Sequence, residues 1–254
     1  MKKFRFYPAS LSLVNEGKAY IYGEYFDVDA NIMKDKSKGL AFWNIDETGK
    51  ILSEKYLSWD VDMGKYLSVN AKGKIDDFGF MFLHQFVQTA DGNIYAIGEG
   101  YRKVASALGI LTTIASRGGG GRASVTKLQV TDMMILTFDQ NFNLKGAKVY
   151  DKNKNNFEMD GGYEFVSTPL LGKMIKYNYG GFDYAYTQVN KDLTSFSVCY
   201  SDFVKEKGSY KGGTFNSITV TDGKVTTDRI NTKSDAKWSS VYPSKQGQVL
   251  IMDY

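Results

Sequence analysis

The amino-acid sequence predicts an all-β fold of antiparallel strands in propeller-like repeats, with one inserted α-helix over residues 101–117. The first observation is a motif, G-x-x-Y-x-x-G-E, which occurs at Gly17–Glu24 and again at Gly92–Glu99. Both copies follow a stretch of strand character and a polar turn ending in glycine, a pattern typical of β-hairpins. The second observation is composition, because 18 Tyr, 16 Phe and 26 Gly suit pleated strands joined by tight turns.

Two weaker copies of the motif extend the series along the chain. One starts at Gly181, with Tyr184 in the tyrosine position and Gln188 in the glutamate position. The other starts at Gly247, just before the run Gln248–Ile251. We therefore expect repeats to begin near Gly17, Gly92, Gly181 and Gly247.

A second pattern predicts further hairpins inside the repeats. Apolar strands end in Asp46 and in Asp139, a short turn follows, and in both places an amphipathic strand begins five residues after the aspartate. Asp222-Gly223 gives a tighter version in the third repeat, and this pair of residues is a strong signal for a two-residue hairpin turn. The strands on either side of each turn should pair with one another.

The second repeat carries an insertion. The interval from Glu99 to Asp139 is longer than the matching interval from Glu24 to Asp46 in the first repeat. Within it, apolar residues recur at helical spacing, and the glycines of 118–121 end the stretch. The sequence predicts a helix over 101–117 that packs on a sheet or contacts a partner protein.

Repeats of short antiparallel strands, each with its own turn signals, favour a β-propeller over a β-sandwich. We expect one domain over residues 1–254. It either closes by pairing its last strands with 4–7 or forms an arc of a larger propeller.

The chain resembles a family of uncharacterised bacterial β-propeller-like proteins that are often exported. The resemblance rests on Asp91–Tyr101, the Phe138-Asp139 hairpin, Phe182–Tyr184 and Gly247–Ile251. It implies the propeller-like fold and no established activity. Such proteins usually begin with an export signal, whereas the basic start Met1–Arg5 lacks the apolar segment that would follow in one. The protein is therefore either cytoplasmic or exported in a form that lacks its signal peptide.

Charge and composition exclude several classes of protein. The formal net charge is +4 and the two signs are interspersed, whereas nucleic-acid binding usually requires a clustered basic face. No stretch is long and apolar enough to suggest a membrane span. A lone cysteine, Cys199, cannot form an internal disulfide, and its apolar surroundings predict a packing role.

The repeats suggest one candidate site. Equivalent positions in successive repeats of a propeller lie on a ring around its axis, and Glu24, Glu99 and Gln188 occupy one such position, with Tyr25 and Tyr101 beside it. Acids and aromatic rings at a concave mouth suit a sugar or a cationic ligand. In the alternative interpretation, the two glutamates bond to the neighbouring repeat and hold the sheets together.

Other motifs give no catalytic, metal or cofactor site. The run Arg117–Arg122 has glycines but lacks the strand before and the Lys-Ser/Thr after that a phosphate loop requires. His84 is the only histidine, so a multi-histidine metal site is excluded, and a position inside a strand is expected. We expect a non-catalytic binding or scaffolding protein with a glycan, small-molecule or protein partner. The alternative is an enzyme acting on a sugar or similar molecule through Glu24 or Glu99.

Overall fold

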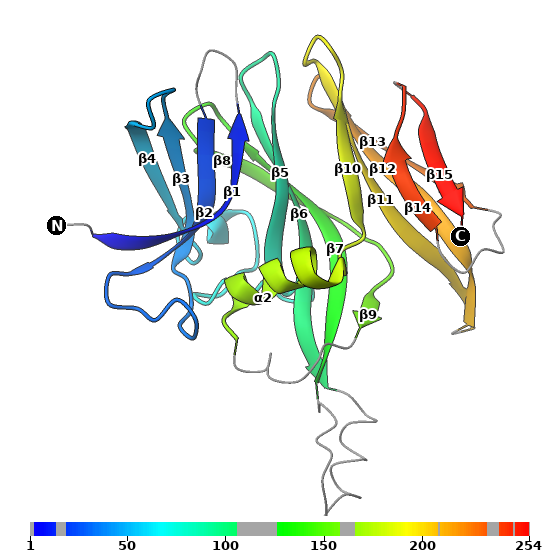
Figure 1. The fold of residues 1–254 in the computed structure, drawn as a ribbon, viewed down its shortest axis with the longest axis horizontal. Coiled ribbons are helices and arrows are strands. Elements are labelled where there is room, and N and C mark those ends of the chain that lie inside the picture. Colours follow the sequence, from blue (N-terminus) through cyan, green and yellow to red (C-terminus); the bar gives the residue numbers. More distant parts are fainter. Residues whose placement is uncertain are drawn as a thin grey trace, which may run out of the picture.

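The computed structural model describes residues 3–13, 19–105, 126–157, 166–207, 209–232, 239–245 and 247–253. It is an all-β structure, as the sequence predicts, with 61% of residues in strands and 7% in helices. The strands form antiparallel sheets that stand side by side in a row, from β1–β4 at one end to β14 and β15 at the other (Figure 1).

Three of the sheets have four consecutive strands in simple up-and-down order, and the fourth has two. The first sheet contains β1 (Phe4–Leu13), β2 (Ala19–Asp27), β3 (Gly39–Ile45) and β4 (Ile51–Ser58). The second contains β5 (Phe80–Gln88), β6 (Ile94–Ala105), β7 (Thr126–Phe138) and β8 (Leu144–Tyr150), with β9 (Asn155–Phe157) also paired to β7. The third contains β10 (Tyr184–Val189), β11 (Ser195–Glu206), β12 (Ser209–Thr221) and β13 (Lys224–Asn231). The last contains β14 (Ser239–Pro243) and β15 (Val249–Asp253).

The hairpins predicted at the aspartates are confirmed. The Asp46 carboxylate accepts hydrogen bonds from the backbone N–H groups of Thr48 and Lys50 between β3 and β4. The Asp139 carboxylate binds the turn between β7 and β8 in the same way. A short side chain that bonds its own backbone two and four residues on favours a turn at that point.

The helix predicted over 101–117 is wrong where the structure describes it. Tyr101–Ala105 prolong β6 and pair with the start of β7, while 106–117 lie outside the described residues. The five residues Tyr101–Ala105 are compatible with a strand as well as a helix. They form a strand because β7 supplies the hydrogen bonds. The α-helix in the described ranges is instead α2 (Thr168–Met174), followed by the π-helical turn η3 (Ile175–Tyr179); a 3-10 turn, η1 (Met63–Lys65), follows β4.

Two hydrophobic cores join the sheets and place the second sheet in the middle. One face of the second sheet packs on the first sheet, where Phe86 and Phe138 contact Phe42. Its other face packs on the third sheet, where Tyr95 contacts Phe196. Successive side chains along a strand of the second sheet point to opposite faces, so they enter the two cores in turn.

The placement of the third repeat differs from the sequence-based expectation. Gly92 lies in the turn between β5 and β6, and Gly247 lies between β14 and β15. Gly181, however, precedes β10, the first strand of the third sheet, so Gln188 is on a first strand whereas Glu24 and Glu99 are on second strands. The turn that corresponds to Gly92 is at 190–194, which has no glycine to reveal it.

Candidate functional site

The five residues predicted to bind a ligand are dispersed. Glu24 and Glu99 hold matching places, opposite Tyr7 of β1 and Phe82 of β5, but they contact different partners. Tyr101 lines the same small cavities as Glu24. Tyr25 packs on Phe4 and Tyr56 on the other face of the first sheet. Gln188 lies on β10 in the third sheet and donates a hydrogen bond to the Ser244 carbonyl at 3.2 Å.

Glu99 is the centre of a buried ionic cluster, which we call the Glu99 clasp: His84, Glu99, Lys152 and Asp183. Lys152 Nζ lies 3.1 Å from Glu99 Oε1 and 2.5 Å from Asp183 Oδ2. His84 Nε2 lies 3.2 Å from Glu99 Oε2. The side chains of His84, Glu99 and Lys152 are 0% exposed. The charges of Glu99 and Lys152 therefore depend on their partners in the clasp, because water does not reach them.

The clasp joins the second sheet to the third. Glu99 is on β6, and its carboxylate accepts the backbone N–H of Asp183 and that of Tyr184, each at 3.1 Å, where β10 begins. The His84 ring stacks on the Tyr184 ring at 4.4 Å between centroids. Glu99 thus bonds to the neighbouring sheet, as expected if the glutamates hold the repeats together. Its side chain presents no surface to a ligand.

Burial and charge act against each other in the clasp. Burial disfavours the charged form of Glu99, but the nearby His84 nitrogen and the charge of Lys152 outweigh it and hold the pKa of Glu99 below its ordinary value. Burial raises the pKa of Asp183 to about 6, although the Lys152 charge opposes this. Burial lowers the pKa of His84, so this ring is neutral at pH 7. Glu99 and Lys152 are therefore a retained ion pair, and Asp183 is the member that titrates most easily.

Glu24 lies between the first sheet and the second, where it faces two small cavities. Ser37 donates a hydrogen bond to its carboxylate, and Trp59 Nε1 donates to Ser37 Oγ at 3.1 Å. Burial raises the pKa of Glu24 to about 7. The two cavities that it lines have volumes of about 30 and 10 Å³. They have room for water but not for a sugar ring.

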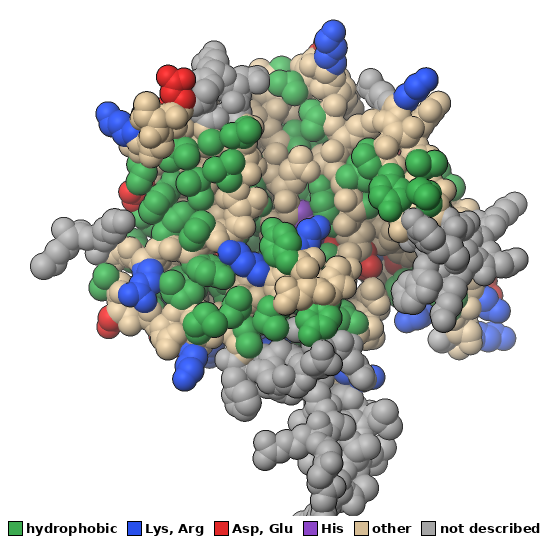
Figure 2. Space-filling view, viewed as in Figure 1, with side chains coloured by type: hydrophobic (Ala, Val, Ile, Leu, Met, Phe, Trp, Pro, Cys, Tyr) green, Lys and Arg blue, Asp and Glu red, His purple; other side chains and the backbone are tan. Residues whose placement is uncertain are grey.

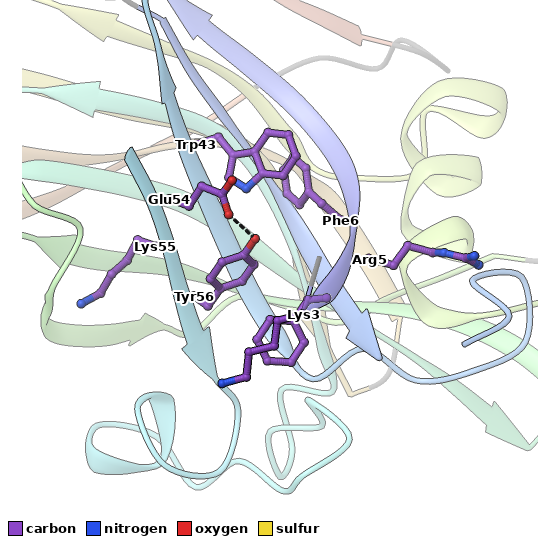
Figure 3. Close-up of a pocket in the computed structure, with 8 residues that line it drawn as sticks. Lys3, Arg5, Phe6, Trp43, Glu54, Lys55 and Tyr56 are labelled. Carbon is purple, nitrogen blue, oxygen red and sulfur yellow. Dashed lines mark hydrogen bonds between the residues drawn. The ribbon is translucent and has the colours of Figure 1, made fainter. Parts of the chain in front are cut away.

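An open groove crosses the outer face of the first sheet, which we call the aromatic groove (Figure 3). Its volume is about 520 Å³, within the range of small-molecule sites. Aromatic rings and one carboxylate form its floor, with cations at its rim; the lining residues are Lys3, Phe4, Arg5, Phe6, Trp43, Glu54, Lys55 and Tyr56. The centroids of the Phe6 and Trp43 rings lie 4.3 Å apart at an interplanar angle of 32°, so the two rings pack against one another in the groove.

The centre of the aromatic groove is polar but not cationic. Tyr56 donates its hydroxyl hydrogen to Glu54 Oε2 at 2.7 Å, and both groups face the Trp43 ring (Figure 3). Arg5 points away, toward the carbonyl of Ala30, and Lys55 turns outward to Asn143, which its Nζ reaches at 2.7 Å. The groove therefore offers a carboxylate and a phenol beside the packed rings of Phe6 and Trp43.

The aromatic groove was missed by the sequence analysis, although a signal was present. Phe4 and Phe6 alternate on β1, and Tyr56 and Glu54 alternate on β4, so each pair shares one face of its strand. Nothing local indicates that this face of the sheet stays open. Figure 2 shows that hydrophobic side chains gather on the surface over β1–β4 and again over β14 and β15.

A metal site and a membrane-spanning helix are two further features on which the described residues bear. Within them, no group of three or more His, Cys, Asp or Glu side chains is placed to hold a metal ion. None of the helices in those ranges has the length and apolar character needed to cross a membrane.

Comparison with known proteins gives a family but no activity. The chain belongs to DUF6770, a family of unknown function whose model matches residues 1–254. No curated protein matches the chain.

Proposed function

We propose that this member of DUF6770 is a propeller-like, non-catalytic binding module, and that the aromatic groove holds a neutral sugar. The observation that carries the proposal is the open aromatic groove on the first sheet, where the Phe6 and Trp43 rings pack together with the Glu54–Tyr56 pair beside them. The up-and-down sheets in a row support the propeller-like arrangement.

The chemistry of the groove favours a sugar. One face of a pyranose ring carries C–H groups that stack on an aromatic ring, and its edge carries hydroxyls that need acceptors and donors. The packed pair of Trp43 and Phe6 supplies aromatic surface, Glu54 supplies an acceptor, and Tyr56 supplies a hydroxyl. A carboxylate at the centre disfavours an anionic sugar, and Lys3 beside the Phe4 ring disfavours a cation. A neutral sugar is therefore the ligand class that we propose for this groove.

The enzyme alternative has weaker support. An acid or base catalyst needs a carboxyl group with a shifted pKa inside a cleft that admits substrate. Glu24 has the shifted pKa, but its cavities admit only water. Glu99 is enclosed by its partners. A binding role therefore fits the geometry better. A polysaccharide outside the cell would also fit the exported bacterial setting that the sequence resemblance implies.

The test is a thermal-shift screen of the full chain against neutral oligosaccharides, followed by calorimetric titration of each hit. A ligand at a hundred times its Kd should add about 2.7 kcal/mol to the free energy of unfolding. Trp43→Ala should then weaken binding about tenfold or more, which is about 1.4 kcal/mol. Tyr210→Ala, which removes an exposed ring from a different sheet, is the matched control and should leave binding unchanged.

Three results would contradict the proposal. The first is a screen in which no neutral sugar stabilises a well-folded sample. The second is a sugar whose affinity survives Trp43→Ala and Glu54→Gln. The third is a sugar that the protein converts to product in proportion to time, because that outcome would restore the enzyme alternative.

A further inference from the structure

The outer edge of β15 differs from the other outer edges of the molecule. In the fourth sheet β15 pairs with β14 on one side, and no described strand pairs with it on the other. An unpaired edge presents a row of backbone N–H and C=O groups that can bind another strand. A two-stranded sheet is also marginally stable without further strands.

Natural proteins protect exposed edges with charges, prolines or bulges, and the other sheets here do so. β1 has Pro8 and a bulge beside it. The strands β4, β8 and β13 carry charged residues: Glu54 and Lys55, Lys145 and Lys148, and Lys224, Asp228 and Arg229. The strand β15 has the sequence Val249-Leu250-Ile251-Met252-Asp253, with no proline and no bulge, and its one charged residue stands at its end. Four consecutive residues of this edge, 249–252, therefore carry none of these protecting features.

A groove lies next to this edge. Its volume is about 470 Å³, and it runs between Gly247–Val249 and the face of the third sheet that is turned away from the second. The floor carries small polar side chains, among them Ser217 and Thr219 on β12 and Asp228 on β13. Gln188 of β10 holds the hairpin at one side of the groove through its bond to Ser244.

The complete sheets indicate what would fill this groove. In each of them a third strand continues the up-and-down order beside the second, namely β3, β7 and β12. The strand β14 lies next to β10 as the first strand of its sheet, and β15 is its second. The position of a third strand is thus the outer edge of β15, over the groove.

We infer that this edge binds an extended strand of a partner polypeptide, paired antiparallel to β15. Main-chain hydrogen bonds to β15 would supply affinity, as in other cases of strand addition. Val249 lines the groove, whereas Leu250 and Met252 are 50% and 43% exposed. The partner strand therefore alternates, with small or polar side chains toward Ser217 and Thr219 and apolar ones on the face of Leu250 and Met252.

The experiment supplies such a strand at high effective concentration. A Gly/Ser linker is added after Tyr254 of the full chain, followed by eight residues that alternate Thr and Val. The control carries the same eight residues with the four Val first and the four Thr last. Hydrogen exchange of the β15 amides is then measured. We expect at least tenfold slower exchange with the alternating strand and no change with the control.

A variant and a dilution series complete the test. Leu250→Lys places a charge on the edge and should abolish the slower exchange in the alternating fusion. Equal exchange in both fusions and in the unmodified chain would overturn the inference. Equal protection by the control would also overturn it, because it would indicate collapse without a register. If exchange in the unmodified chain slows as its own concentration rises, the occupant is a second copy and the inferred partner strand is wrong.

Discussion

Replacing Glu24 by glutamine should stabilise the protein at alkaline pH. The Glu24 carboxyl accepts a hydrogen bond from Ser37 and lies near the ammonium of Lys173, yet burial dominates and raises its pKa from 4.5 to about 7. Ionising the Glu24 carboxyl therefore costs more free energy in the folded protein than in the unfolded chain, where water solvates the charge. Glutamine has nearly the same shape, can accept the Ser37 bond, and carries no charge.

The magnitude follows from the two pKa values. Each pKa unit corresponds to about 1.4 kcal/mol, so the difference between 4.5 and about 7 gives about 3 kcal/mol. Because the folded-state pKa is the higher one, the free energy of unfolding falls as pH rises from about 4.5 to 7. Glu24→Gln should remove this fall, so the variant should gain up to about 3 kcal/mol over the wild type by pH 8.

Urea denaturation of both proteins from pH 4 to pH 8 measures the effect. The useful quantity is the difference between variant and wild type at each pH, because the titration of Asp183 and of other groups cancels in it. Glu47→Gln, at an exposed glutamate in the turn after β3, is the control and should give a difference near zero at every pH. If the Glu24→Gln difference is constant across the series, burial does not set the pKa of Glu24 and the reasoning fails.

Three further changes test the clasp and the packing of the strands. Glu99→Gln should lower the free energy of unfolding by about 3–5 kcal/mol, since it takes from the buried Lys152 one of its two carboxylate partners. Urea denaturation at pH 7 measures this change, and a loss below about 1 kcal/mol would refute the assigned role of the ion pair. Asp183→Asn should remove a decrease in stability between about pH 4 and 6, because the folded-state pKa of Asp183 is the higher one, and an unchanged pH profile would contradict this. Gly100→Ala would place a methyl group in collision with Thr131 Oγ1 and the Phe78 carbonyl, and should lower the melting temperature by several degrees. Gly146→Ala, where nothing lies within 4 Å, should leave the melting temperature nearly unchanged, and equal melting temperatures for the two variants would refute the packing argument.

Local interactions explain what the sequence could predict. The hairpins at Asp46 and Asp139 form from bonds within a few residues, so the pattern in the sequence is sufficient. The predicted helix is wrong at Tyr101–Ala105 because the decisive bonds there come from β7, which lies well beyond these residues in the sequence. Local pattern cannot report a partner strand of that kind.

The candidate sites depended on contacts between distant residues, and the sequence could not supply these. Lys152 follows β8 in a stretch that reads as a polar loop, yet it is buried because Glu99 and Asp183 meet there. Gln188 was assigned to the wrong strand because the true turn of the third sheet, at 190–194, has no glycine. The aromatic groove required knowledge of which sheet face stays open, and that depends on the order of the sheets.

The clasp also has a consequence for how the chain can be divided. Its members come from β5, from β6, from the segment after β8 and from the residue before β10, so they belong to two sheets. A fragment that ended after Lys152 would leave Glu99 without the backbone donors of Asp183 and Tyr184. The second and third sheets are therefore expected to fold and unfold as one cooperative unit. Recombination between relatives should exchange them together, whereas a crossover between them would separate buried charges that contact one another.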